Sequence, residues 1–433
     1  MKAKMLFAVF LLLTTSPVCA FADTPAKIDS GDTAFVLLSA ALVMLMTPGL
    51  ALFYGGMVRG KNVLGTLMQS FIAIAVISVQ WILFGYSLAF GPDIHGIIGN
   101  LDWAVLCGVG ANPNPDYAPT VPHLAFMIYQ AMFAVITPAL ITGAVAERMK
   151  FSAFLLFVVL WSTIVYDPIA HWLWGTGGWL KNMGALDFAG GVVVHISSGI
   201  SALAAALIMG RRKGFPHDAM YPHNLPMTVL GAGLLWFGWF GFNAGSALSS
   251  GVLSTWAFVA THTSAVAATL IWVIIEWLHR GKPTMFGAAT GSIAGLATVT
   301  PASGFISPMS ALIIGLAAGA VCYVALNMKV KFGYDDSLDA FGVHGVGGII
   351  GTLATGLFAQ TLINPAGSNG LFFGNPGLLV TQFIAVGVSV VYSFVITLIL
   401  LKVIDMIVGL RINEDDEHKG LDISQHGERG YSS

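Results

Sequence analysis

Long apolar stretches separated by short polar loops dominate the chain. Each stretch is close to the roughly 20 residues that a helix needs to cross a hydrocarbon core. They lie near residues 33–58, 64–90, 123–146, 151–174, 190–210, 224–248, 256–278, 284–304, 308–328, 340–360 and 377–408. Because helices satisfy their own backbone groups in lipid, the pattern predicts an all-α polytopic membrane protein with eleven transmembrane helices.

A shorter apolar run precedes these stretches. Two lysines stand before it, and the tripeptide AFA at 20–22 has the small-x-small form of a signal peptidase site. Since the run is too short to span a bilayer, we predict that residues 1–22 are a cleaved signal peptide. Residues 23–410 then form the transmembrane domain, and residues 411–433 form a polar tail.

Basic residues are concentrated in every second loop between the apolar stretches. The loops that alternate with these contain one basic residue, Lys181. Every second loop is basic, with Arg59 and Lys61, Arg148 and Lys150, Arg211 to Lys213, Arg280 and Lys282, and Lys329 and Lys331. By the positive-inside rule, this alternation predicts a mature N-terminus outside the cell and a C-terminus in the cytoplasm.

The composition narrows the class of protein further. Of 433 residues, 56% are hydrophobic and 9% are charged, against about 25% charged residues in soluble domains. The formal net charge of −2 provides no field that would hold nucleic acid. A soluble enzyme and a nucleic-acid-binding protein are therefore excluded, and a lipid bilayer is the expected surrounding.

Two histidines fall within the apolar stretches. His195 and His344 both follow valine and are flanked by glycine-rich sequence. Eight residues at about 1.5 Å each place His195 roughly 12 Å below Asp187, inside a hydrocarbon core about 30 Å thick. Ionisable groups at that depth are costly, so both histidines are candidates for function.

The two histidine segments resemble each other, each with an aspartate, then apolar and glycine residues, then Val-His. They fall in the fifth and tenth stretches, which cross the membrane in opposite senses. This predicts a five-plus-five inverted repeat whose pseudo-two-fold axis brings the histidines together. Chance similarity, or two separate interhelical hydrogen bonds, remains an alternative. A bis-histidine haem is a rival interpretation, and a zinc site lacks identifiable third and fourth ligands.

Asp187 has two interpretations. Its carboxylate can cap the first turn of the fifth helix, or it can be a buried anion that draws a cation inward. By analogy, Asp339 is expected to order the start of the tenth helix. The acidic tail is either a solvated, disordered end or a segment for docking and regulation.

Several longer motifs occur in a fixed order along the chain. They are TPGLALFYGG at 47–56, DFAGG and HISSG from 187 to 199, WFGFNAGS at 239–246, and DAFGVHG at 339–345. With these motifs the chain strongly resembles the bacterial ammonium transporter (Amt) family of the Amt/Mep/Rh superfamily. The resemblance implies a homotrimer in the inner membrane, with a hydrophobic pore in each subunit and no cofactor, metal or enzymatic activity.

The resemblance also assigns residues to the pore. His195 and His344 match the family's twin pore histidines, and Phe133 and Phe242 match its two stacked gate phenylalanines. The tail matches the region that couples subunits and accompanies docking of a PII signal protein. The outer substrate recruitment site is matched by Trp174, Ser246, Tyr129 and Asp187, with Tyr129 standing where phenylalanine is usual.

The function implied is ammonium transport. Ammonium, or methylammonium, would be recruited at the outer aromatic site and deprotonated, and ammonia would pass through the hydrophobic twin-histidine pore with net charge movement. Two alternatives stay open at this point: an electroneutral ammonia channel like the Rhesus proteins, and an ammonium sensor that signals through the tail.

Overall fold

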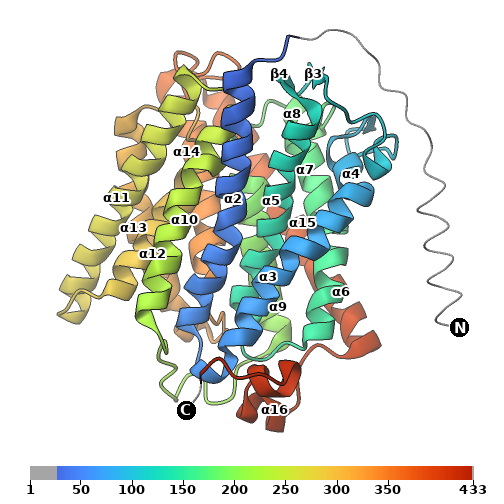
Figure 1. The fold of residues 1–433 in the computed structure, drawn as a ribbon. Coiled ribbons are helices and arrows are strands. Elements are labelled where there is room, and N and C mark those ends of the chain that lie inside the picture. Colours follow the sequence, from blue (N-terminus) through green and yellow to red (C-terminus); the bar gives the residue numbers. More distant parts are fainter. Residues whose placement is uncertain (1–26, 432–433) are drawn as a thin grey trace, which may run out of the picture.

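The structure, a computed structural model, describes residues 27–431, and the regular secondary structure in that range is almost entirely helical (Figure 1). The predicted signal peptide lies outside the described residues. Ten helical segments within 27–431 are long and apolar enough to cross a membrane. They are Ser30–Met57, Gly60–Phe90, His123–Val145, Phe151–Asn182, Gly191–Met209, Leu225–Gly245, Val252–Arg280, Pro308–Phe332, Phe341–Phe358 and Pro376–Val408. The prediction of an all-α, multi-pass protein is confirmed.

One predicted span is short. The stretch near 284–304 forms the α-helix Met285–Val299, whose 15 residues fall below the roughly 20 that a perpendicular crossing requires. The predicted count of eleven transmembrane helices therefore stays a prediction.

The α-helices are α2 (Ser30–Met57), α3 (Val63–Gln80), α4 (Tyr86–Phe90), α5 (His123–Val145), α6 (Phe151–Trp161), α7 (Asp167–Trp174), α8 (Trp179–Asn182), α9 (Ser197–Met209), α10 (Leu225–Gly245), α11 (Val252–Arg280), α12 (Met285–Val299), α13 (Pro308–Phe332), α14 (Val346–Phe358), α15 (Pro376–Val408) and α16 (Glu414–Lys419).

Four of the spanning segments are not continuous α-helices. Each contains a π-helical turn, and such turns occur frequently at functional sites. The turns are Trp81–Gly85, Ser162–Tyr166, Gly191–Ile196 and Phe341–Gly345. His195 and His344 lie in the last two, so both candidate histidines project from locally widened helix.

The helices form one bundle with a distinct loop region at each end (Figure 1). In this view α11, α12 and α13 lie on one side of α2 and α10, and α3, α4, α6 and α7 lie on the other. At one end, the long loop between α4 and α5 forms two small antiparallel sheets, β1 (Asp93–Ile94) with β2 (Ile98–Gly99) and β3 (Pro113–Asn114) with β4 (Ala118–Pro122). We call this the vestibule end. The tail and α16 lie at the opposite end, the tail end (Figure 1).

A buried ionic network holds the tail end together. Glu147, 1% exposed, accepts hydrogen bonds from Arg59 Nε at 3.1 Å and Arg212 Nη1 at 3.2 Å. Arg212 also pairs with Asp335, its Nη2 lying 2.8 Å from Asp335 Oδ1. Burial raises the pKa of the Glu147 carboxyl, but hydrogen bonds and charge from the two arginines outweigh it, and the pKa lies below its usual value. The predicted basic loops thus converge at one end of the bundle.

The tail packs on this network. Glu417 accepts hydrogen bonds from Arg411 Nη2 at 2.7 Å and from the backbone N–H of Lys213 at 2.8 Å. Asp422 accepts one from the backbone N–H of Gly65 at 2.9 Å. The tail is therefore ordered against the bundle through Tyr431, the last described residue, and its role in docking and regulation stays a prediction.

Candidate functional site

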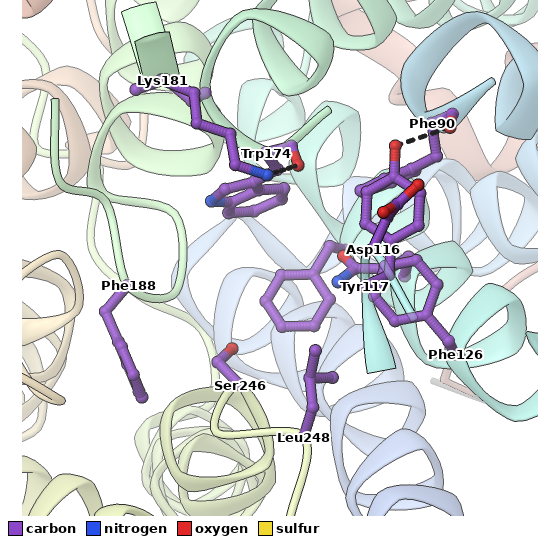
Figure 2. A pocket seen from close by; sticks show the side chains of 12 residues that line it. Phe90, Asp116, Tyr117, Phe126, Trp174, Lys181, Phe188, Ser246 and Leu248 are labelled. Atoms are coloured by element: carbon purple, nitrogen blue, oxygen red, sulfur yellow. Dashed lines mark hydrogen bonds between the residues drawn. The ribbon is translucent and has the colours of Figure 1, made fainter. Parts of the chain in front are cut away.

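A cavity of about 190 Å³ opens at the vestibule end (Figure 2). We call it the vestibule. Among the residues expected to recruit a substrate, Trp174 and Ser246 line it, as does Phe133. The remaining lining residues are Phe90, Asp116, Tyr117, Phe126, Gln130, Leu173, Lys181, Phe188 and Leu248. Half of the twelve lining residues are thus aromatic, and four are polar or charged.

Trp174 is held in place by the chain that follows it. It ends α7, and its indole Nε1 donates a hydrogen bond to the backbone carbonyl of Asp187 at 2.8 Å. Its ring meets the Phe133 ring edge to face, with centroids 5.8 Å apart. Ser246, just after α10, donates its hydroxyl to the carbonyl of Phe242 at 2.9 Å. Because that bond uses the hydroxyl proton, the oxygen can accept a hydrogen bond from a cation in the vestibule.

Asp187 caps a helix. Its carboxylate oxygens accept four backbone hydrogen bonds, at 2.5 to 3.0 Å, which satisfy the otherwise unpaired N–H groups of a helix start. The donors are the N–H groups of Gly190, Gly191, Val192 and Val193. The carboxylate does not line the vestibule, so the capping interpretation describes its contacts, and Asp187 acts on the vestibule by holding Trp174.

Tyr129 lies behind the vestibule. It is fully buried, and its hydroxyl lies 2.9 Å from the carbonyls of both Gly241 and Phe242 and 3.2 Å from Ser246 Oγ. The resemblance assigned Tyr129 to the outer recruitment site, but the residue does not line the vestibule, and its hydroxyl points toward the end of α10. Tyr129 therefore supports Ser246 from behind.

Two phenylalanines separate the vestibule from a second, smaller cavity. The rings of Phe133 and Phe242 lie with centroids 4.3 Å apart and planes at 41°. Phe133 borders the vestibule, and Phe242 borders the second cavity. The two rings that the resemblance paired are therefore in contact and stand between the two cavities.

The second cavity contains the two histidines. His195 Nδ1 and His344 Nδ1 are 3.2 Å apart, and the ring planes differ by 16°. Both side chains are buried, and His195 Nε2 has no hydrogen-bond partner among the described residues. The cavity measures about 10 Å³, close to the minimum of about 10–15 Å³ that a single water requires. Its other lining residues are Met46, Leu50, Ile136, Leu140, Val194, Leu235, Trp239, Phe242 and Ile293, all apolar or aromatic.

Close backbone contact explains why the histidines can approach. A Cβ placed on Gly199, four residues after His195, would lie 2.1 Å from the backbone nitrogen of Gly345. A Cβ on Gly348, four residues after His344, would lie 3.0 Å from His195 Cβ. Each glycine therefore lets its helix pass directly beside the histidine turn of the other.

The aspartate that precedes His344 is not the one expected. Asp336 accepts hydrogen bonds from the backbone N–H groups of Phe341 at 2.8 Å and Ala340 at 3.2 Å. Asp339 instead accepts one from Lys329 Nζ at 2.5 Å, so its assignment as the organising residue was wrong. Burial, followed by the charge of Asp339, raises the pKa of the Asp336 carboxyl to about 6.

With this correction the two segments match over a longer register. Asp336 precedes His344 by eight residues, and Asp187 precedes His195 by eight. Both carboxylates accept backbone N–H bonds at the start of a segment that continues as a π-helical turn. This shared construction supports the predicted inverted repeat, which stays a prediction.

The histidine geometry does not fit a bis-histidine haem. In such a haem the two imidazole nitrogens bind the iron from opposite sides at about 2.0 Å each, so they lie about 4 Å apart. The two Nδ1 atoms are 3.2 Å apart, which is too close for an iron between them. In residues 27–431, moreover, no group of three or more histidine, cysteine or acidic residues could hold a metal.

Some lining residues were not singled out from the sequence. Gln130 and Asp116 line the vestibule, and Trp239 stacks beside His195 with centroids 5.6 Å apart. Trp239 belongs to a motif that was quoted for the resemblance, so a signal for it was present. Lys181 was noted only as the exception to the pattern of basic loops, and that exception was its signal.

Comparisons with known proteins match almost the whole chain. The profile described as "Ammonium Transporter Family" matches residues 34–431. The "Ammonium transporter" of Bacillus subtilis (strain 168) is 54% identical over 402 residues, 93% of this chain and 98% of that protein. "Ammonium transporter Amt1" of Archaeoglobus fulgidus is 50% identical over 404 residues, 93% of this chain and 100% of its own length.

Solved structures give the same result. Saccharomyces cerevisiae Mep2 superposes with a TM-score of 0.85 at 35% identity, covering 90% of this chain and 89% of its own. A protein described as "Sensor Amt Protein" superposes with a TM-score of 0.84 at 29% identity, covering 92% and 98%. The resemblance inferred from the motifs is thus confirmed, and the chain belongs to the ammonium transporter family.

Proposed function

We propose that the protein takes up ammonium by recruiting it in the vestibule, removing a proton and passing ammonia between the two histidines. One observation carries this proposal: an aromatic vestibule, a pair of touching phenylalanines and a buried histidine pair follow one another in that order. Membership of a family whose relatives are named ammonium transporters supports the substrate.

Recruitment depends on Trp174 and Ser246. The face of an indole attracts a small cation with about 0.5–2 kcal/mol, and the serine oxygen can accept one N–H bond from it. Neither interaction distinguishes ammonium from potassium strongly. Selectivity must therefore arise at a later step that potassium cannot perform.

Loss of a proton is such a step. Beyond Phe133 and Phe242, the space is lined by apolar side chains and by the histidine pair. Moving a whole cation into these surroundings would cost many kcal/mol, whereas the neutral ammonia molecule is much less costly to transfer. Ammonium can become neutral by releasing a proton, and potassium has none to release.

The histidine pair provides polar partners in this apolar space. When both rings are neutral, one Nδ1–H donates to the other Nδ1. The donating ring then has an acceptor at Nε2, and the accepting ring has its N–H at Nε2. Ammonia, which both donates and accepts, can therefore bond successively to one acceptor and one donor. The released proton follows separately, giving net movement of charge.

The setting of the protein is part of the proposal. From the resemblance, three copies assemble in the inner membrane, and the vestibule end faces outward. The docked tail, which contacts Lys213 and Gly65 through Glu417 and Asp422, would transmit binding of a PII signal protein at the cytoplasmic face.

Ammonium-evoked current in proteoliposomes tests the transport proposal. Wild-type protein should give current with ammonium and none with potassium, and His195→Ala and His344→Ala should lose either the current or the discrimination. Gly233→Ala is a matched control, because a methyl group added at Gly233 would meet no atom within 4 Å and this residue lies on an exposed face of α10. Uptake of ammonia without current would favour the electroneutral channel.

The sensor alternative also has one supporting observation, the similarity to the "Sensor Amt Protein". It predicts ammonium binding without transport. Absence of both current and internal alkalinisation, together with retained ammonium binding, would replace the transporter proposal with the sensor.

A further inference from the structure

We infer that Lys181 is a tethered cation that competes with ammonium in the vestibule, and that Asp116 is its counter-charge. The inference rests on the proposed function, since it concerns the affinity of the same vestibule. On this inference Lys181 and Asp116 set the affinity for substrate, although neither residue belongs to the phenylalanine pair or to the histidine pair.

The Lys181 side chain ends in the same chemical group as the proposed substrate, a protonated amine. Its Nζ donates a hydrogen bond to the backbone carbonyl of Trp174 at 3.1 Å. It also lies 5.8 Å from the centroid of the Tyr117 ring, within cation–π range. Figure 2 shows the side chain reaching over Trp174 from the rim. The vestibule therefore already binds one ammonium group through a carbonyl and an aromatic face.

The backbone that carries Lys181 is held in place. Its short helix, α8, is joined to the neighbouring loop by a hydrogen bond from the N–H of Trp179 to the carbonyl of Gly96 at 3.1 Å. Asn182 donates its side-chain amide to the carbonyl of Gly177 at 2.8 Å. With both ends of α8 tied down, the lysine side chain stays within reach of the vestibule.

The other charges near the vestibule are already engaged. The Asp187 carboxylate accepts four backbone N–H groups, and Asp93 accepts hydrogen bonds from His171 and from the backbone of Gly96. Among the residues that line the vestibule, Asp116 is the one carboxylate and Lys181 the one ammonium group. Their two charges therefore set the local field that an arriving cation meets.

The expected size of the effect follows from Coulomb's law. For a separation of about 7–10 Å and an effective dielectric constant of about 40–80, one unit charge changes cation affinity by roughly two- to sevenfold. Lys181 lowers the affinity by this factor, and Asp116 raises it. Both effects shrink at high ionic strength, because the two side chains are exposed to solvent.

The test measures the ammonium concentration that gives half-maximal current, and the concentration that gives half-maximal quenching of tryptophan fluorescence. Both values are compared between wild type and matched variants. Lys181→Met removes the charge and keeps the length, and it should lower half-saturation about two- to sevenfold. Lys181→Arg keeps the charge and should resemble wild type, and Asp116→Asn should raise half-saturation. Lys27→Met removes a charge from an exposed position outside the vestibule and is the control.

The inference is overturned if Lys181→Met and Lys27→Met give the same half-saturation as wild type, or if the effect of Lys181→Met does not decline in high salt. Failure of the proposed function is a different result, namely no wild-type current and no alkalinisation. The quenching titration then still compares the variants. If wild-type protein gives current without quenching, the half-saturation of the current alone decides, and a wild-type protein that gives neither would overturn the inference as well.

Discussion

Replacing Gly199 with alanine should separate the two histidines. The added methyl group would lie 2.1 Å from the backbone nitrogen of Gly345 and 2.4 Å from its Cα. Ordinary contact begins at 3.4 Å, so the two helices must move apart by about 1.3 Å. The Nδ1 atoms of His195 and His344, now 3.2 Å apart, would then exceed hydrogen-bond distance.

The effect on stability should be smaller than the effect on transport. Overpacking costs about 1–3 kcal/mol, and replacing glycine by alanine within a helix returns about 1 kcal/mol. The net loss of about 0–2 kcal/mol leaves a folded protein, while the polar path between the histidines is broken.

Ammonium-evoked current and the thermal unfolding midpoint, measured on the same preparations, check this reasoning. We expect Gly199→Ala to lose most of its current with a modest fall in the midpoint. Gly233→Ala makes the same chemical change in α10 where no neighbour lies within 4 Å, and it should keep its current. A Gly199→Ala protein with wild-type current would refute the argument that close helix approach maintains the histidine pair.

Two further predictions concern the supporting carboxylates. Asp187→Ala removes the acceptor of four backbone N–H groups, at about 1–3 kcal/mol for each group left buried and unpaired, so the unfolding midpoint should fall. A midpoint unchanged from wild type would contradict the capping role. Glu147→Gln weakens the pairing with Arg59 and Arg212. The folded-state pKa of the Glu147 carboxyl lies below its usual value, so its negative charge stabilises the fold. That stability is fully present above the unfolded-state pKa of about 4.3 and is lost as the pH falls through the folded-state pKa. The difference in midpoint between wild type and Glu147→Gln should therefore be full at neutral pH and narrow in acid, and a difference that grows in acid would contradict the assignment.

Much of the fold was determined by the sequence alone. Apolar stretches of spanning length and polar loops between them predict a helical membrane protein, because lipid allows few other solutions for the backbone. The alternation of basic loops predicted which loops share an end, and the structure joins Arg59, Glu147 and Arg212 at one end. Local contacts could also be predicted, since the carboxylate of Asp187 caps the turn that begins four residues later, at Gly191.

Other features depended on the tertiary structure. Whether Tyr129 faces the vestibule or the end of α10 is decided by which carbonyls lie within reach, and these belong to a helix more than a hundred residues away. The choice between Asp336 and Asp339 was likewise decided by Lys329, which binds Asp339 and leaves Asp336 to the helix start. Lys181 lines the vestibule from α8, which a hydrogen bond joins to the loop at Gly96, a contact between segments more than eighty residues apart. Sequence spacing fixes what a residue can do within a turn or two, whereas side-chain partners between helices are set by packing, where a difference of about 1 Å makes or breaks a hydrogen bond.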